Sequence, residues 1–309
     1  MLISLEIKEL NLFVGRIVKK KFAVFLAVFV SFLIGVYFAA EYYVTKKVEE
    51  KVERKLKALR PEIDVKYETC KVSLFKKSVS LENVDISGSF FKEPLRIEKI
   101  TVENIDRKNS FPHYAKISVR NGTIPVVNFP GELRYVMDLL GYQNKISFNS
   151  SLDYFFDSEK RDFSLKAFHL DVLDAGVLDV SLKLTEIPDF GNIKGLESLL
   201  FKVLSIKLGS GKIIYEDKGF YKRMVNAIAR YKHLSPEVVR KKIKSKINRE
   251  FGNDAVSNMI KNAFLKFVEN PERLKVEFHP EKPVSIGTIL FNLGTDVMVK
   301  ELNLRVEAN

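Results

Sequence analysis

The chain has 309 residues, a net charge of +12, a single cysteine and no tryptophan. A length of this order is enough for one or two packed domains, and the single cysteine excludes an internal disulfide framework. Charged residues make up 29% of the chain and glutamine occurs once, at Gln143. This composition is typical of proteins from thermophiles.

An apolar segment near the N-terminus runs for nineteen residues, from Phe22 to Ala40, without a charge. As a helix it would be roughly 28 Å long, close to the ~30 Å hydrocarbon core of a bilayer. Basic residues precede it and two tyrosines follow it, as at the two interfaces of a membrane span. We therefore expect a basic segment at 1–21 and a transmembrane helix at 22–43. The side chains expected to contact lipid are Phe22, Leu26, Phe29, Phe32, Leu33, Val36 and Tyr37.

The charge on the two sides of this segment leaves its orientation open. Lysines and arginines number five in residues 1–21 and seven in residues 41–60, and that count alone would place the C-terminal side in the cytoplasm. Long domains, however, are translocated largely regardless of charge. We expect the N-terminus inside and the large C-terminal domain outside.

Beyond the apolar segment, the pattern changes from helix to strand. Residues 44–60 predict a charged helical stalk that ends at Pro61. Residues 61–217 predict a mainly β domain of alternating strands, interrupted by a short helix at 132–140 and including a strand stretch at 198–217. Residues 218–270 predict two or three helices, one of which begins at Ser235-Pro236. Residues 271–309, including the alternating 298–308, predict strands that rejoin the sheet.

A phrase of the form apolar-x-x-apolar-x-apolar recurs in these segments, so that the period-2 alternation slips by one residue. Such a slip reverses the buried face unless a bulge absorbs it, which predicts kinked strands. In a chain with 46% apolar residues the phrase can also arise by chance. The five instances are Leu81-Val84-Ile86, Ile97-Ile100-Val102, Leu165-Phe168-Leu170, Phe201-Leu204-Ile206 and Val299-Leu302-Leu304.

The start of the chain resembles AsmA-like envelope proteins, which are anchored in the bacterial inner membrane. The resemblance lies in the apolar segment followed by the strand phrase Val72-Ser73-Leu74-Phe75 and the first two slipped phrases, and its spacing extends over about residues 20–210. It implies an α+β, mainly β fold: a transmembrane helix, a curled antiparallel sheet with an apolar inner face, and here a C-terminal helical block packed on it. It also implies a single-pass protein of the inner (cytoplasmic) membrane, with its C-terminal domain in the periplasm, that serves lipid movement or outer-membrane maintenance.

The apolar face of such a sheet can hold acyl chains as readily as its own core. Burial of apolar area is worth ~25 cal/mol per Å² whichever partner covers it, so a packed core is the ordinary alternative. The candidate groove residues are Leu81, Val84, Ile86, Ile100, Val102, Phe168 and Leu170.

A basic block at residues 218–249 contains eleven lysines and arginines and one acid, Glu237. An amphipathic basic helix here could lie on anionic headgroups, at ~1 kcal/mol per basic residue, or could be a solvated helix packed on the sheet. Nucleic acid is not expected, because no recognised binding motif occurs. The residues predicted to contact an anionic surface are Lys222, Arg223, Arg240, Lys241 and Lys244.

No enzyme motif is found. The four histidines, His113, His169, His233 and His279, lack metal-ligand spacing. Gly209-Ser210-Gly211-Lys212 lacks the other residues of a phosphate loop, and the three aspartates around Ala175-Gly176 predict a hairpin turn rather than a calcium loop. We expect no catalytic residue, metal or cofactor.

Three functional hypotheses follow, of which the third, a hydrolase with an unrecognised site, has no positive support in the sequence. The first is a non-enzymatic envelope protein that handles lipids, with the bilayer, lipid acyl chains and other envelope proteins as partners. The alternative is a periplasmic scaffold that docks other envelope proteins.

Overall fold

The computed structural model describes residues 36–38, 40–58, 60–106, 112–188, 196–252, 254–292 and 295–309. Most of the predicted transmembrane helix, including residues 22–35, lies outside these ranges. In the part of the chain that is described, no helix combines the length and the apolarity that a membrane crossing requires.

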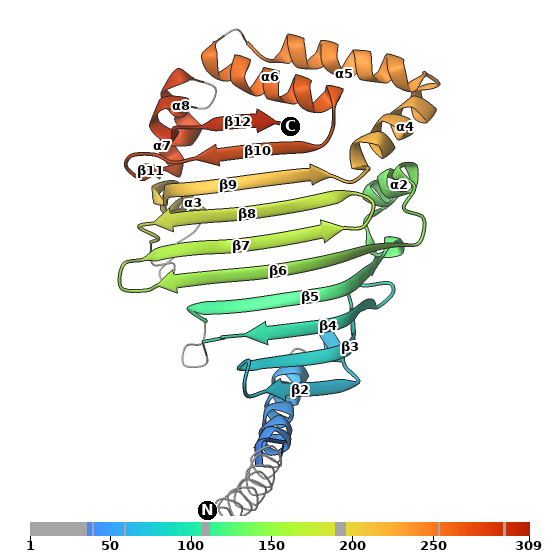
Figure 1. Ribbon diagram of the computed structural model, residues 1–309, viewed down its shortest axis with the longest axis vertical. Helices are drawn as coiled ribbons and strands as arrows, with labels where there is room; N and C mark the ends of the chain where they lie inside the picture. The colour runs from blue at the N-terminus through green and yellow to red at the C-terminus, as the bar shows by residue number, and fades with distance from the viewer. Residues whose placement is uncertain are drawn as a thin grey trace, which may run out of the picture.

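The first described element is the N-terminal helix, residues 36–38 and 40–57, which leads into the sheet (Figure 1). It covers most of the segment predicted as a stalk. Proline cannot donate the backbone hydrogen bond that a helix interior needs, so the end of the helix shortly before Pro61 is expected.

A single antiparallel sheet of twelve strands forms the body of the protein. The path of hydrogen-bonded neighbours runs β1-β3-β4-β5-β6-β7-β8-β9-β10-β12, with β2 paired to β3 and β11 paired to β9. The strands are β1 (Ile63–Lys66), β2 (Thr69–Ser73), β3 (Ser78–Gly88), β4 (Leu95–Glu103), β5 (Tyr114–Pro125), β6 (Lys145–Asp157), β7 (Asp162–Val172), β8 (Gly176–Thr185), β9 (Lys207–Asp217), β10 (Arg273–Phe278), β11 (Val284–Ser285) and β12 (Arg305–Ala308).

The sheet is open, so the prediction of a curled sheet is wrong. Its two edges, β1 with β2 and β12, lie at opposite ends of the strand order, and Figure 1 shows one broad, stacked ladder of strands. Bulges bend individual strands, but curling a sheet needs a coordinated series of them. Their effect here is mainly to restore the alternation of side chains within each strand.

Two of the three slipped phrases within strands, those on β3 and β7, coincide with backbone irregularities, whereas the phrase on β4 pairs with β3 and β5 without a register shift. Asn83 in β3 and Asn121 in β5 have positive φ, at 53° and 50°, and the register shifts between Val119 and Gly122. In β7 the register against β8 shifts between Leu165 and Phe168, as the sequence predicts.

The two remaining phrases begin on helices, and there the strand prediction is wrong. The first two residues of each phrase lie on a helix, Phe201 and Leu204 on α3 (Leu196–Ser205) and Val299 and Leu302 on α8 (Asp296–Leu302). The later parts of the predicted stretches 198–217 and 298–308 do form strands, β9 and β12. In α3, leucines at 196, 199, 200 and 204 follow the i, i+3, i+4, i+8 spacing of a helix face, so the helical period overrides the shorter alternation.

The other helices connect strands and lie beside the strand ends or beyond β12 (Figure 1). They are η1 (Val126–Asn128), α2 (Gly131–Leu140), α4 (Phe220–Lys232), α5 (Pro236–Glu250), α6 (Ala255–Glu269) and α7 (Ile286–Phe291). The predicted short helix and the predicted helix start are confirmed: α2 ends at Leu140, and the Ser235 side chain caps α5 by accepting a hydrogen bond from the Val238 N–H.

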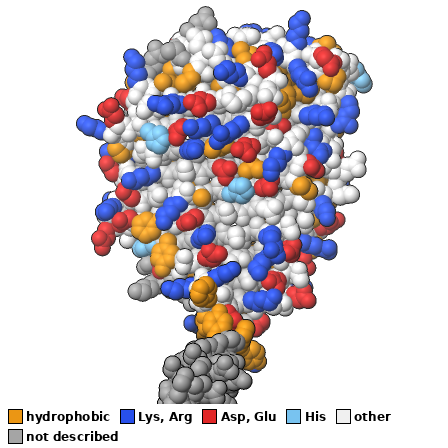
Figure 2. Space-filling view, in the orientation of Figure 1, with side chains coloured by type: hydrophobic (Ala, Val, Ile, Leu, Met, Phe, Trp, Pro, Cys, Tyr) orange, Lys and Arg blue, Asp and Glu red, His pale blue; other side chains and the backbone are white. Residues whose placement is uncertain are grey.

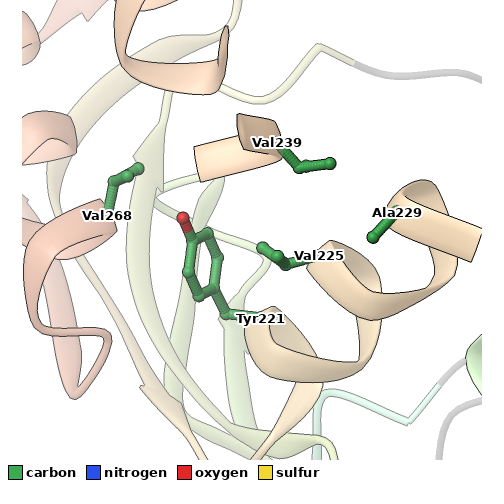
Figure 3. Close-up of a cluster of buried hydrophobic side chains, with 5 residues drawn as sticks. All are labelled: Tyr221, Val225, Ala229, Val239 and Val268. Atoms are coloured by element: carbon green, nitrogen blue, oxygen red, sulfur yellow. The ribbon is translucent and has the colours of Figure 1, made fainter. Parts of the chain in front are cut away.

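Helices α4, α5 and α6 cap the sheet at β10 and β12, at the end opposite the N-terminal helix (Figure 1). Their shared core joins Tyr221, Val225 and Ala229 of α4 to Val239 of α5 and Val268 of α6 (Figure 3). All five are nearly excluded from solvent. Three of the five largest fully buried side chains, Val225, Val239 and Val256, lie in the cap.

Candidate functional site

An unbroken row of apolar side chains crosses the sheet from one end to the other. Each member is the direct cross-strand partner of the next, and cross-strand partners project from the same face. We call this the first row; it consists of Val72, Val79, Val102, Ile117, Leu152, Phe168, Val180, Ile213, Val276 and Val306.

A second row runs beside the first on the same face, two residues away along each strand in the central part of the sheet. Only Ser150 interrupts its apolar character. The second row consists of Cys70, Leu81, Ile100, Val119, Ser150, Leu170, Leu178, Tyr215, Leu274 and Ala308. With ~4.8 Å between neighbouring strands, the two rows form a strip roughly 45 Å long. We call this strip the apolar track.

The side chains between the two rows project from the opposite face and are almost all polar. They are Lys71, Ser80, Thr101, Ser118, Ser151, His169, Asp179, Ile214, Lys275 and Glu307. Figure 2 shows a broad face on which basic and acidic side chains are interspersed. The sheet therefore has one solvated face and one apolar face.

Among the residues that the structure describes, the apolar track is covered only at its two ends. Within the two rows only Cys70, Val72 and Ala308 are buried, and these lie on β2 and β12. The members on β3–β10 are half-buried, and the Ile213 side chain is 41% exposed. Among the described residues, strands β4–β8 pack chiefly against one another, and no helix packs extensively on them. A sheet face inside a core would be buried along its whole length.

All seven residues predicted to line a groove lie on the apolar face. Val102 and Phe168 belong to the first row, and Leu81, Ile100 and Leu170 to the second. Val84 and Ile86 follow the kink at Asn83. Val84 pairs with Ile97, Ile97 with Gly122, and Gly122 with Phe148 across successive strands. Phe148 lies four residues before Leu152 on β6, so it projects from the same face as the track. Val84 is only 1% exposed, so it is part of the core and not of a contact surface.

A polar ladder accompanies the kinked strands on the other face. The Asn121 side chain donates to the Glu98 carboxylate at 2.5 Å, and the Asn149 carboxamide oxygen accepts from the Asn121 N–H at 2.8 Å. These bonds to Asn121 and Arg120 hold the pKa of Glu98 below its usual range. Asparagine tolerates positive φ better than most residues. The hydrogen bonds made by Asn121 therefore hold the irregular backbone of β5 at this residue.

Three polar residues on adjacent strands bring together the side-chain types of a hydrolytic triad. Ser151, His169 and Asp179 are cross-strand neighbours, and His169 Nδ1 lies 2.7 Å from Asp179 Oδ1. No hydrogen bond joins Ser151 to His169 among the contacts of the described residues. These residues lie on the solvated face, and without the serine–histidine bond we assign them no chemical role. The described residues also contain no group of acids, histidines or cysteines arranged to bind a metal.

The basic block lies in the cap, on α4 and α5. Of the predicted contact residues, Arg223 is paired with Asp174 at 3.5 Å and Lys244 with Glu269 at 2.7 Å. Lys222, Arg240 and Lys241 are exposed, and no acid lies within salt-bridge distance among the described residues. Of the predicted anchor residues, only Val36 and Tyr37 are described, at 49% and 36% exposure; Phe22, Leu26, Phe29, Phe32 and Leu33 lie outside the described residues.

Sequence reasoning missed a basic hollow between α2, α4 and α5. This hollow, about 770 Å³ in volume and open to solvent, is lined by Leu140, Gly141, Arg223, Asn226, Ala229, Arg230, His233, Leu234 and Pro236. Arg230 Nη2 donates to the Leu139 carbonyl at 2.7 Å, and Arg223 Nε donates to the Asp174 carbonyl at 3.2 Å. The i, i+7 spacing of the two arginines on one helix is the only signal in the sequence.

Sequence reasoning also missed an exposed apolar patch on α3 and α7, two helices that pack together. Phe201 and Phe291 are 73% and 87% exposed, and Leu200 and Leu290 are each 52% exposed. The sequence pattern predicts strands over 198–217 and 271–309, and a strand alternation does not reveal the exposed faces of α3 and α7.

Burial raises the pKa of the Tyr215 and Tyr221 hydroxyls, which lie where the track meets the cap. The Tyr215 hydroxyl donates to Asp217 Oδ1 at 2.8 Å. The Tyr221 hydroxyl has no partner among the described residues. Burial also raises the pKa of the Cys70 thiol at the other end of the track, so that thiol is poorly reactive.

Two comparisons with known proteins match this chain. A family model described as "Uncharacterized protein" matches residues 169–309, which include β8–β12 and the helical cap. A protein of Aquifex aeolicus (strain VF5), also described as "Uncharacterized protein", is 27% identical over 273 residues, covering 82% of this chain and 86% of that protein. Neither description refers to AsmA-like proteins.

Proposed function

We propose that this protein is a membrane-anchored, non-enzymatic protein of the cell envelope whose apolar track holds the acyl chains of lipids. The observation that carries the proposal is the first row, which stays apolar over ten strands although most of it is not buried. A row of this length on a solvated surface is costly for solubility unless a partner covers it. Lipid chains are extended and apolar, and they match a narrow strip of this shape.

The energetics favour a lipid on the track. A fully buried methylene contributes about 0.8 kcal/mol, and a chain lying on an open face is covered on one side, which gives roughly half of that. A chain of ordinary length would then be held by several kcal/mol, enough to bind it reversibly. Weak contacts spread evenly along the track would allow the chain to move along it.

The proposed location is the bacterial inner membrane, with a single N-terminal anchor and the sheet in the periplasm. Support comes from the uncharged segment at 22–40 and from the resemblance to AsmA-like proteins in the first strands. In this arrangement the strand order runs away from the anchor, so the track would lead from the membrane surface toward the helical cap. The function proposed is lipid handling in envelope maintenance.

Photocrosslinking in cells tests the proposal on the full chain. A photoreactive phenylalanine is placed at Leu152 or Val180 in the first row, and at Ser151 or Ser181 on the opposite face as matched controls. Intact-mass spectrometry is expected to find lipid adducts at Leu152 and Val180 and none at the two serines. Adducts of equal yield on both faces, or none on the apolar face, would refute lipid binding by the track.

A second candidate function is an interaction module that docks other envelope proteins, and the exposed patch on α3 and α7 favours it. Phe201 and Phe291 are more exposed than the members of the track, and exposed aromatic clusters commonly mark protein interfaces. Photoreactive residues at Phe201 and Phe291 would then yield protein adducts. Protein adducts at Leu152 as well, in place of lipid, would favour this function over lipid handling.

A further inference from the structure

We infer that the basic hollow between α2, α4 and α5 is a binding site for a phosphate group, in the form of a lipid headgroup. The inference rests on the proposed function for the ligand's acyl chains. The phosphate site itself rests on separate residues, Arg223, Arg230, His233 and Asn226, which line the hollow.

The two arginines are held in place by backbone carbonyls rather than by acids alone. Arg230 makes one hydrogen bond, to Leu139 at 2.7 Å, among the described residues. A guanidinium carries five N–H donors, so most of those on Arg230 remain available. Arg223 Nη1 contacts the Leu140 carbonyl at 3.5 Å. Arginine side chains that are already oriented lose less entropy on binding phosphate, which their forked geometry matches.

The charge balance around the hollow favours an anion. Asp174 pairs with Arg223 at 3.5 Å, and two further acids lie close in the chain to the lining: Asp138 in the last turn of α2 and Glu237 in the first turn of α5. No acid lies within salt-bridge distance of Arg230 among the described residues. Pro236, at the start of α5, also lines the hollow, and the first turn of this fifteen-residue helix adds positive potential. The C-terminal ends of α2 and α4, at Gly141 and His233, add negative potential that the two arginines offset. The exposed basic residues of α5 extend this potential over the cap.

The turn between β7 and β8 links the hollow to the apolar track. Arg223 donates to the Asp174 carbonyl at 3.2 Å, and the next carbonyl, that of Ala175, lies 3.4 Å from the Tyr215 hydroxyl. Tyr215 is a member of the second row. A lipid with its phosphate between Arg223 and Arg230 could therefore extend its chains past Tyr215 onto the track.

Two probes on the purified full chain in detergent test the site: inorganic phosphate and a short-chain phosphatidic acid, each titrated by calorimetry. Arg230→Gln is expected to weaken binding of the short-chain phosphatidic acid roughly tenfold, as the loss of hydrogen bonds to a charged group predicts. Arg249→Gln removes the same charge from an exposed position on α5 and is expected to leave binding within a factor of about two. Equal weakening by both variants would show that binding reflects general electrostatic attraction, and it would overturn the assignment of the hollow as a phosphate site.

The variants also separate binding from folding. Arg230→Lys keeps the charge but not the fork, so it is expected to bind more weakly than the wild type at an unchanged melting temperature. If Arg230→Gln does not fold, Asn226→Ala provides the second test, because Asn226 is exposed and lines the hollow. Unchanged binding in Asn226→Ala and in Arg230→Lys would overturn the assignment.

The two probes distinguish the source of the phosphate. Tighter binding of phosphatidic acid than of inorganic phosphate, reduced selectively by Leu178→Gln on the track, supports a lipid headgroup. Equal binding of the two probes, unaffected by Leu178→Gln, retains the phosphate site but overturns its lipid assignment. Lipid adducts at Leu152 without binding of either probe would retain the proposed function and overturn the site.

Discussion

The ring of Phe148 occupies the space in which a side chain at Gly122 would lie. The two residues are cross-strand partners on β6 and β5, and a Cβ at Gly122 would be 2.5 Å from the ring's Cζ. Gly211 and Phe278 repeat the arrangement on β9 and β10. In both pairs an aromatic ring covers the backbone of the neighbouring strand, which keeps the apolar face continuous where a glycine leaves a gap.

Gly122→Ala should therefore displace the Phe148 ring and destabilise the protein by about 1–3 kcal/mol, as overpacking does elsewhere. Urea denaturation measures the effect. Gly131→Ala is the matched control, because nothing lies within 4 Å of a Cβ at Gly131 and alanine favours the helix that Gly131 begins. Equal losses of stability in the two variants would contradict the packing of Phe148 on Gly122.

The two buried tyrosines at the end of the track should respond oppositely to loss of the hydroxyl. Tyr221→Phe removes a hydroxyl that has no partner, so stability should stay the same or rise. Tyr215→Phe removes a bond to Asp217 of 2.8 Å and should cost roughly 1–2 kcal/mol. Thermal denaturation of both variants against the wild type checks the pair. A loss in Tyr221→Phe as large as that in Tyr215→Phe would mean that the Tyr221 hydroxyl has a partner.

Sequence patterns predicted the strands well because alternation is a local property. The slip at Leu165 and Phe168 marked a bulge, and the groove residues Leu81 and Leu170 were placed on one face although they are far apart in the chain. The register that aligns them into a row depends on cross-strand pairing, which no single segment encodes. The prediction failed at Phe201 and Leu302, where short helices contain the same spacing as a slipped strand.

The basic hollow was beyond sequence reasoning for a similar reason. Arg223 and Arg230 belong to the basic block at 218–249. The sequence of this block does not indicate which of its basic residues share a surface. The orientation of the two arginines depends on the carbonyls of Leu139 and Leu140, more than eighty residues earlier in the chain. The curl was predicted wrongly because a kink at Asn83 bends one strand without determining the shape of a whole sheet.

Acid should weaken the β10 strand through Glu277. Lys275 and His279 hold the pKa of this carboxyl at about 2, below its ordinary 4.5. A lowered folded-state pKa contributes stability above the unfolded value, and this contribution is lost as the pH falls from 4.5 toward 2. Glu277→Gln should therefore lower the melting temperature at pH 7, and the difference from the wild type should shrink below pH 4.5. Glu281→Gln, at an exposed position without an ion pair among the described residues, is the control. A difference that is constant from pH 7 to pH 2.5 would contradict the ion-pair origin.

The position of the basic block at the end of the sheet opposite the N-terminal helix leads to a prediction about surfaces. If the N-terminus anchors the chain in one membrane, the exposed Arg240, Lys241 and Lys242 on α5 lie at the far end of the sheet from it and can meet a second anionic surface. Full-length protein reconstituted in vesicles should then tether added vesicles that contain anionic lipid, as measured by light scattering. The tethering should weaken as salt rises, because exposed charges are screened within about 8–10 Å at physiological ionic strength.

Charge reversal separates this effect from overall charge. Lys241→Glu with Lys242→Glu should abolish most of the tethering, since each basic residue near an anionic surface contributes about 1 kcal/mol. Lys76→Glu with Lys92→Glu makes the same change in net charge at exposed positions on the β2–β3 and β3–β4 turns, near the other end of the sheet, and should leave tethering intact. Tethering that falls equally in both double variants would show that net charge governs it, and tethering that survives reversal on α5 would exclude the cap as a contact surface. Because neither pair lies on the apolar track, lipid adducts at Leu152 should be the same in all of these variants.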